Sequence, residues 1–264
     1  DVAFGPTQQY QYDGLNRITR FQDGANNWQT IDADRYGNWW MTGNSGMPPA
    51  AQTPAATNRL TTVTYDDTTG NQVSYSPYTL AYDAENRLIS ATSLANGSAS
   101  YRYDGEGRRV TESRCGSANS STGCTMQTPG AITTVFVYDA MGNLAADYSS
   151  GWAQPDGLRF VTVDALGSTR LTTDASGGDI RRFDYSPYGE LRTGNGRSTA
   201  PGYGRMRPSM QFTGKERDDS MTRLDYFGAR YFGASQGRST TPDPVNANIL
   251  RVINPPRWNM YAYA

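Results

Sequence analysis

The sequence predicts an all-β protein in which repeated β-hairpins form a curved or spiralling antiparallel sheet. Two observations predict this class. A degenerate unit that contains a Tyr-Asp pair recurs about every 21 residues, a spacing typical of stacked supersecondary units. The 264 residues include 18 Tyr and 28 Gly, which suits thin sheets with amphipathic faces and turns of positive φ.

Four units show the repeat most clearly, and each has Asn or Gly shortly after the Asp of its Tyr-Asp pair. In a hairpin with a three-residue loop, the Asp side chain accepts backbone N–H bonds where the turn begins, and Asn or Gly tolerates the left-handed conformation that closes it. Weaker copies begin near residues 34, 65, 164 and 185. The expected turn residues are Tyr12, Asp13 and Asn16; Tyr82, Asp83, Asn86 and Arg87; Tyr103, Asp104 and Gly107; and Tyr138, Asp139 and Gly142.

The second of these units gives the most specific expectation. A three-residue loop places Asp83 opposite Arg87 and Tyr82 opposite Leu88. A carboxylate–guanidinium contact then lies beside an aromatic–aliphatic cross-strand pair. We expect Asn86 to have positive φ, which a β-branched residue resists.

Arginine dominates the basic residues of the chain. Of the 24 basic residues only Lys215 is not arginine. Biased base composition of the genome is one explanation; the physical one is that the Arg fork pairs with Asp and stacks on Tyr in ways that an ammonium group cannot. In the third unit, for example, Tyr103 should face Arg109 and stack on its guanidinium group.

The two cysteines, Cys115 and Cys124, flank the polar segment GSANSSTG. We predict a disulfide between them, which would contribute about 2 to 3 kcal/mol by closing a short loop. Two free surface thiols are the alternative. A disulfide favours an extracytoplasmic location. Because the chain starts at Asp1 without a signal peptide, we expect a processed chain or a fragment.

Two segments are expected along the chain. Residues 1–159 contain the hairpin repeats, and residues 160–264 carry a series of more distinctive motifs. Segments rich in Pro, Ala, Gly or Ser at 47–57, 149–157 and 194–208 predict long surface loops. Gly and Pro occur too often for a helix of more than a few turns.

Several classes of function are excluded by composition. The net charge of −1, without long runs of either sign, does not suit a nucleic-acid partner, and no apolar stretch approaches the roughly 20 residues of a membrane span. The absence of histidine removes His-based triads and the usual zinc sites. The acidic turns offer too few ligands per loop for a calcium site. We therefore expect no cofactor, no metal and no catalytic residue.

Four aromatic residues, Tyr226, Phe227, Tyr231 and Phe232, cluster near the C-terminal end. We expect them to seal a sheet. The alternative is a platform on which carbohydrate rings stack.

From Phe160 onward the motifs are highly specific. They read VDALGSTRLTTDASGG, RRFDYSPYGE, QFTGKERDDSMTRLDYFGARYF, GRSTTPDP and NPPRWNMYAYA. This segment resembles the RHS-repeat-associated core domain, and the upstream units resemble RHS or YD repeats. The resemblance implies β-hairpin strips that spiral into a hollow shell, carried by secreted bacterial toxins and related cell-surface proteins.

The chain also departs from the family pattern. Ala165 stands where the family usually has His, and Gly233-Ala234 where it has Asp-Pro. The aspartyl self-cleavage residues of the family follow the tyrosine-rich WNMYAYA motif and have no counterpart in this sequence. The resemblance therefore assigns no catalytic residue, and a self-cleaving peptidase is disfavoured.

The sequence thus predicts a non-enzymatic extracellular structural β-repeat protein of the RHS type, which forms a wall, a shell segment or a self-assembling fibre. The alternatives are a carbohydrate-binding adhesin module and a fragment of a secreted toxin's encapsulating shell. For the adhesin, glycans would be partners, and the five Trp residues would offer exposed ring faces: Trp28, Trp39, Trp40, Trp152 and Trp258.

Strand counting leads to an expectation about assembly. Eight hairpins at about 4.8 Å per strand would roll into a ring only about 25 Å across. A folded cargo of about 100 residues is roughly 34 Å across, so the chain alone cannot enclose one. Open edge strands recruit other strands. We expect the terminal strands to pair with other copies or with the remainder of a larger RHS chain.

Overall fold

The chain is all-β, as the sequence predicts. The computed structural model describes residues 6–45, 56–116, 123–151, 158–178, 180–194, 197, 209–218, 221–244 and 258–263. These residues form eighteen strands in four antiparallel sheets, with one short 3-10 helix, η2 (Phe212–Gly214). No helix of this part of the chain is long and apolar enough to span a membrane.

Each sheet is a meander, because strands that are neighbours in space are also neighbours in sequence. The first sheet contains β1 (Gln8–Tyr12), β2 (Ile18–Asp23), β3 (Asn27–Ala33) and β4 (Trp39–Ser45). The second contains β5 (Ser74–Tyr75), β6 (Tyr78–Tyr82), β7 (Leu88–Ser93), β8 (Gly97–Tyr103), β9 (Arg109–Cys115), β10 (Ile132–Tyr138) and β11 (Leu144–Ser149). The third contains β12 (Arg159–Val163), β13 (Thr169–Asp174) and β14 (Arg181–Arg182). The fourth contains β15 (Glu216–Arg217), β16 (Leu224–Tyr226), β17 (Tyr231–Gly233) and β18 (Arg238–Ser239).

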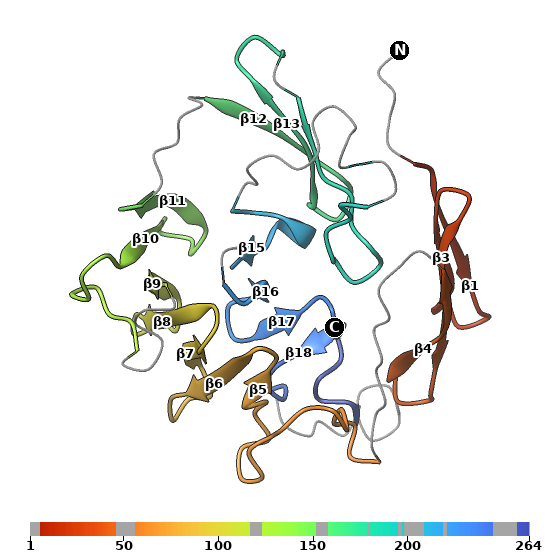
Figure 1. Ribbon diagram of the computed structural model, residues 1–264, viewed down its shortest axis with the longest axis horizontal. Coiled ribbons are helices and arrows are strands. Elements are labelled where there is room, and N and C mark those ends of the chain that lie inside the picture. The colour runs from red at the N-terminus through yellow and green to blue at the C-terminus, as the bar shows by residue number, and fades with distance from the viewer. Residues whose placement is uncertain are drawn as a thin grey trace.

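The fourth sheet lies at the centre of the molecule, and the other three sheets surround it (Figure 1). We call the seven-stranded sheet β5–β11 the wall and the sheet β15–β18 the inner sheet. The main hydrophobic core lies between them, and its buried members are Tyr75, Tyr78, Leu80, Leu88, Ala91, Ala99, Tyr101, Leu224, Tyr226 and Tyr231. The wall is curved, as expected, and its concave side is occupied by the inner sheet, which the chain forms later in the sequence (Figure 1).

The turn at residues 83–87 has the predicted geometry. The backbone N–H groups of Glu85 and Arg87 each donate to Oδ1 of Asp83 at 2.9 Å. Nε of Arg87 donates to Oδ2 of Asp83 at 2.7 Å. Asn86 has a φ of 61°, and Tyr82 pairs with Leu88 across the strands. The local predictions for this unit are therefore confirmed.

The same turn recurs in the other units. The corresponding side-chain pairs are Asp13 with Arg17, Asp104 with Arg108 and Asp139 with Asn143, and the residues of positive φ are Asn16, Gly107 and Gly142. Two weaker copies also form it, because Asp34 and Asp164 begin turns in which Gly37 and Gly167 have positive φ. Most of the loops expected at 47–57, 149–157 and 194–208 lies outside the described residues.

A substitution at Asn86 tests the importance of the left-handed position. Replacing Asn86 with Val should lower the free energy of unfolding by about 1 kcal/mol or more, because a β-branched side chain resists positive φ. Ala84→Val, in the same exposed turn, is the matched control and should have little effect. Chemical denaturation measures both, and equal effects of the two substitutions would contradict the prediction.

Candidate functional site: the buried junction between the wall and the inner sheet

Arg109 connects the wall to the inner sheet. It begins β9, and it is 0% exposed. Its guanidinium group forms an ion pair with Glu216 of β15, and its Nη1 donates to the hydroxyl oxygen of Tyr231 in β17 at 3.1 Å. A guanidinium group withdrawn from water requires such partners, because an uncompensated buried charge is strongly unfavourable.

Four aromatic rings complete the surroundings of this guanidinium group. Its central carbon lies 4.6 Å from the ring centre of Phe136 and 4.7 Å from that of Tyr226. The rings of Tyr101 and Tyr231 lie at 5.6 Å and 5.8 Å. Two of these rings come from the wall and two from the inner sheet. We call these four rings and the guanidinium group the Arg109 cage. Cation–π attraction is strongest where the cation is desolvated, so the cage helps to hold both sheets against the same guanidinium group.

The backbone of Arg109 is also held from both sides. Its N–H group donates to the hydroxyl oxygen of Tyr226 at 2.9 Å, and its carbonyl oxygen accepts a hydrogen bond from the hydroxyl group of Tyr138 at 2.9 Å. Tyr138 of the repeat therefore serves as a hydrogen-bond donor, and Tyr226 of the inner sheet serves as an acceptor, in addition to the hydrophobic surface of their rings.

A group of carboxylates faces the same junction. Glu112 of β9 is 3% exposed, and Asp218, which follows β15, is also 3% exposed. Oδ2 of Asp218 accepts hydrogen bonds at 2.8 Å from the hydroxyl groups of Tyr101 and Thr222. The hydroxyl of a wall residue is thus bound to a carboxylate of the inner part of the chain.

Burial, and secondly repulsion from Asp218, raises the pKa of Glu112 to about 8. Arg109 and Arg114 act in the opposite direction, and Glu216 adds to the repulsion. Burial likewise raises the pKa of Glu216, although the guanidinium group of Arg109 opposes the shift. At neutral pH, therefore, Glu112 is predominantly protonated, which reduces the excess of negative charge at the junction.

A carboxyl group with a raised pKa is a usual feature of general acids, but it must reach its substrate. The carboxyl groups at this junction belong to residues that are less than a tenth exposed, and they contact the chain's own Arg and Tyr residues. The arrangement can hold two layers together and store a proton between them. No group of three or more potential metal ligands occurs in the described residues.

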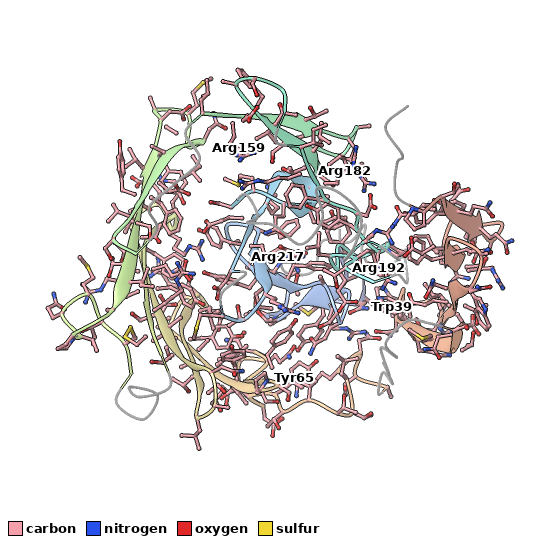
Figure 2. All side chains as sticks on the ribbon, turned by 45° about the horizontal axis from the view of Figure 1, so that its top comes forward. Trp39, Tyr65, Arg159, Arg182, Arg192 and Arg217 are labelled. Atoms are coloured by element: carbon pink, nitrogen blue, oxygen red, sulfur yellow. A yellow bond between two sulfur atoms is a disulfide. The ribbon has the colours of Figure 1, made fainter. Side chains whose placement is uncertain are left out.

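A second buried ion network joins the first sheet to the loops after β14. Arg197 is 0% exposed and donates to both carboxylate oxygens of Asp23, at 2.7 Å and 2.8 Å. Nε of Arg197 donates to Asp184 at 2.8 Å, while Nε of Arg192 reaches Asp23 at 3.3 Å. Figure 2 shows Arg192 between the first sheet and the centre of the molecule, near Trp39. Trp39 stacks on Tyr188 with ring centres 4.5 Å apart.

The two cysteines are joined. The sulfur atoms of Cys115 and Cys124 are 2.01 Å apart, and both residues are almost fully buried. The disulfide ties the end of β9 to the segment that leads into β10. The loop residues 117–122 between them lie outside the described part of the chain.

The carbohydrate platform expected as an alternative is not formed by the four C-terminal aromatic residues. Tyr226, Tyr231 and Phe232 are 9%, 3% and 1% exposed, respectively. Phe227 packs edge-on against Tyr263 with ring centres 5.8 Å apart. A sugar needs an open ring face, whereas these rings pack against the wall or against one another. That placement agrees with the expectation that they seal a sheet.

The expectation that Tyr103 stacks on Arg109 is wrong, because a different arginine stacks on its ring. The two residues are paired across β8 and β9, but the guanidinium group over the ring of Tyr103 is that of Arg87, at 5.1 Å. Arg108 lies over Tyr138 in the same way, at 5.5 Å. The Arg that closes one turn thus stacks on the Tyr that opens the next unit. This regularity could have been found in the sequence by aligning each closing residue with the following Tyr-Asp pair.

Comparisons with known proteins agree with these observations. The family model described as RHS Repeat matches residues 82–117. The chain is similar to "Toxin subunit YenC1" of Yersinia entomophaga, with 28% identity over 218 residues that cover 71% of this chain and 22% of that protein. It is also similar to "Teneurin-1" of Gallus gallus, with 28% identity over 197 residues that cover 69% of this chain and 7% of that protein.

Solved structures share the fold. The crystal structure of TcdB2-TccC3 without its hypervariable C-terminal region has a TM-score of 0.63 and 22% identity, covering 98% of this chain and 15% of that chain. The crystal structure of TcdB2-TccC3-Cdc42 has a TM-score of 0.63 and 21% identity, covering 97% of this chain and 15% of that chain. The chain therefore spans about a fifth or less of the proteins that it matches.

The Arg109 cage should contribute strongly to stability. Arg109→Met should lower the free energy of unfolding by about 3 to 5 kcal/mol, because Glu216 would remain buried without its partner. The double variant Arg109→Met/Glu216→Gln should recover part of this loss, since it removes both charges. Arg102→Met, at an exposed position of β8, is the control, and denaturation curves that do not distinguish it from Arg109→Met would contradict the prediction.

Glu112 should make stability dependent on pH near neutrality. Its pKa of about 8 in the folded protein exceeds the ordinary 4.5, so the native state binds more protons between these values. The resulting stabilisation is complete below the ordinary pKa and is lost as the pH rises toward about 8. Because the chain has no histidine, no imidazole titration overlaps this interval.

The check is the free energy of unfolding measured between about pH 5 and pH 8. Wild type should become less stable as the pH rises. Glu112→Gln should reduce the slope, whereas Glu85→Gln, in an exposed turn, should leave it unchanged. A wild-type profile that is flat or rises over this interval would refute the role given to Glu112.

Proposed function

We propose that the chain is a non-enzymatic, extracellular structural protein whose strands build part of a wall. It is a protein of the RHS-repeat type and has the fold of the TcdB2-TccC3 structures, and both support this proposal. The single observation that carries the proposal is the junction at Arg109. There, charged and aromatic side chains that could serve chemistry are buried between two layers and engaged with one another. In this proposal these side chains hold the two layers together.

The two parts of the chain have different tasks in this proposal. Residues 1–159 are the YD/RHS-type hairpin repeats and form the outer surface. Residues 160–264 are the core segment; its strands β12 and β13 lie outside the inner sheet, whereas its strands β15–β18 return to the concave side and form that sheet (Figure 1). The buried bonds between the parts, such as the Tyr101 hydroxyl with Asp218 and Arg197 with Asp23, support this division.

The chain contributes a segment of a wall, or a unit of a fibre, rather than a complete container. The inner sheet occupies the centre (Figure 1). A cavity beside it, lined by Tyr75, Tyr78 and Arg223 among others, has a volume of about 540 Å³, which is the size of a small-molecule pocket. A segment of the encapsulating shell of a secreted toxin is the alternative that the similarity to "Toxin subunit YenC1" favours.

An extracellular location is supported by the disulfide. Disulfides such as that between Cys115 and Cys124 persist in oxidising compartments and are rare in the cytosol. Both cysteines are buried, each less than 5% exposed.

Glycan binding survives as a second candidate at a different place from the four C-terminal aromatic residues. Trp39 is buried, but Trp258 is 46% exposed and stacks on Tyr36 with ring centres 5.7 Å apart. Trp152 lies outside the described residues. A glycan array with wild type and Trp258→Ala decides: binding that the substitution abolishes would favour an adhesin, and a blank array would remove it.

Assays for turnover test the proposed structural role. We expect the folded chain to leave peptide, ester and polysaccharide substrates unchanged, and to keep its intact mass through long incubation. The reason is that its raised-pKa carboxyl groups are enclosed. Hydrolysis that is lost in Glu112→Gln or Asp218→Asn, but kept in Glu85→Gln, would overturn the proposal.

A further inference from the structure

A cavity lies where the wall, the inner sheet and the loop after β14 meet. Its volume is about 540 Å³, which is within the range of pockets that enclose drug-sized ligands. The wall contributes the β5–β6 turn, the inner sheet contributes β15 and the turn that follows it, and the loop after β14 contributes Glu190, Leu191 and Thr193. We call it the Glu190 cavity. Its lining thus comes from parts of the chain that are far apart in sequence.

Three charged side chains line this cavity, namely Arg217, Glu190 and Arg223. Arg217, which lies at the centre of the molecule (Figure 2), binds both carboxylate oxygens of Asp225 at 2.7 Å and 2.6 Å. Its charge is therefore compensated within the inner sheet. The charges that remain for a ligand are the carboxylate of Glu190 and the guanidinium group of Arg223.

The carboxylate of Glu190 is available. The backbone of this residue is fixed by Ser186, because the N–H group of Glu190 donates to Oγ of Ser186 at 3.1 Å and its carbonyl oxygen accepts from the N–H group of Ser186 at 2.8 Å. Its half-buried side chain makes no hydrogen bond or ion pair with any residue in the described ranges. A carboxylate that is partly withdrawn from water without a partner favours a ligand that donates hydrogen bonds to it.

The guanidinium group of Arg223 is available as well. Arg223 is exposed, and within the described part of the chain its side chain forms no hydrogen bond or ion pair. Its φ is 59°, and its N–H group donates to the carbonyl oxygen of Asp218 at 2.7 Å, which holds the turn. Glycine would satisfy this backbone at a lower cost. The chain instead places a large cation at a left-handed position, a kind of strain that is enriched at ligand sites.

The rest of the lining is polar and offers no open aromatic face. Tyr75 and Tyr78 line the cavity but are only 8% and 6% exposed, so a sugar ring finds no surface on which to stack. Ser76, Asn96 and Thr193 are exposed side chains of the lining. Their hydroxyl and amide groups both donate and accept hydrogen bonds, as the N–H and C=O groups of a peptide require.

We propose that the Glu190 cavity binds a short zwitterionic peptide of two or three residues, with its terminal ammonium group at Glu190 and its terminal carboxylate at Arg223. The two available protein charges are opposite and sum to zero, so the matching ligand carries one charge of each sign. A guanidinium group presents forked N–H donors to a carboxylate, and an ammonium group is a compact donor to one. A cavity of this size takes a ligand larger than a free amino acid. The inference goes beyond the structural role, because it gives the wall a ligand.

Peptides with blocked ends test the charge requirement. The probes are dialanine and trialanine, each also in N-acetylated form and in C-amidated form, and titration calorimetry measures their affinity for the full chain. We expect the free peptides to bind, and we expect a block at either end to weaken binding about tenfold or more. The reason is that each block removes a charge-assisted hydrogen bond in a partly desolvated site.

Variants assign each end of the peptide to its residue. Glu190→Gln should abolish the preference for a free ammonium group and keep the preference for a free carboxylate, whereas Arg223→Gln should do the reverse. Glu85→Gln and Arg102→Gln, at exposed positions outside the cavity, are the matched controls and should bind as wild type does.

Arg223→Gly separates binding from folding. This substitution removes the guanidinium group and also relieves the positive φ, so the variant should be at least as stable as wild type. It should nevertheless lose the preference for a free carboxylate. Chemical denaturation measures its stability, and circular dichroism verifies that every variant is folded.

Four outcomes would overturn the inference. They are no binding of any free peptide by folded wild type up to the solubility limit of the probes, equal affinity for free and blocked peptides, preferences that the substitutions at Glu190 and Arg223 leave unchanged, and tighter binding of a neutral disaccharide such as maltose than of dialanine. Free alanine that binds as tightly as the two peptides would likewise refute a peptide ligand. None of these results would alter the structural role, which the turnover assays test separately.

Discussion

The fold depends on compensating the buried charge of Arg109. A guanidinium group without water must be neutralised and hydrogen-bonded, and here the wall alone does not supply the partners. Glu216 and Tyr231 reach it from the inner sheet, while Tyr101 and Phe136 reach it from the wall. The two layers are therefore not merely in hydrophobic contact. Removing the inner sheet would strand a cation in the wall, so the position of one sheet constrains that of the other.

The repeat supplies the regular geometry on which this junction is built. In each unit the Asp carboxylate fixes the turn by accepting backbone N–H groups, and a positive-φ residue closes it. Each turn then sets the register of its two strands, with a bulge beside the Tyr-Asp pair, as between Ala81 and Tyr82. Since every unit turns the chain in the same sense, the side chains of alternate positions collect on one concave face. Arg109 and Glu112 are both buried although they lie three positions apart in β9, because the bulge between the Tyr103–Arg109 and Arg102–Thr111 pairs shifts the alternation by one residue.

The sequence was sufficient for features that depend on local geometry and insufficient for those that depend on distant partners. The turn at Asp83, the pairing of Tyr82 with Leu88 and the positive φ of Asn86 involve residues within seven positions of one another. Tyr231, in contrast, reaches Arg109 from 122 positions away. Cross-strand pairing placed Tyr103 opposite Arg109, but it could not reveal that the inner sheet would attract the guanidinium group elsewhere. Nor could the alternation of side chains along a strand show that rings such as Phe232 are enclosed, because the layers that cover them come from other parts of the chain.

The junctions also explain in physical terms why arginine rather than lysine carries nearly all the positive charge. Arg217 binds both carboxylate oxygens of Asp225, at 2.7 Å and 2.6 Å, and Arg197 reaches Asp23 and Asp184 at once. An ammonium group is a point charge that cannot present two parallel N–H bonds or lie flat on a ring. Lys215, the one lysine, lies where neither property is needed, with its ammonium group 5.4 Å from the ring centre of Phe227. A wall with a thin apolar core must use its charged residues for cohesion, and cohesion of this kind requires the planar fork.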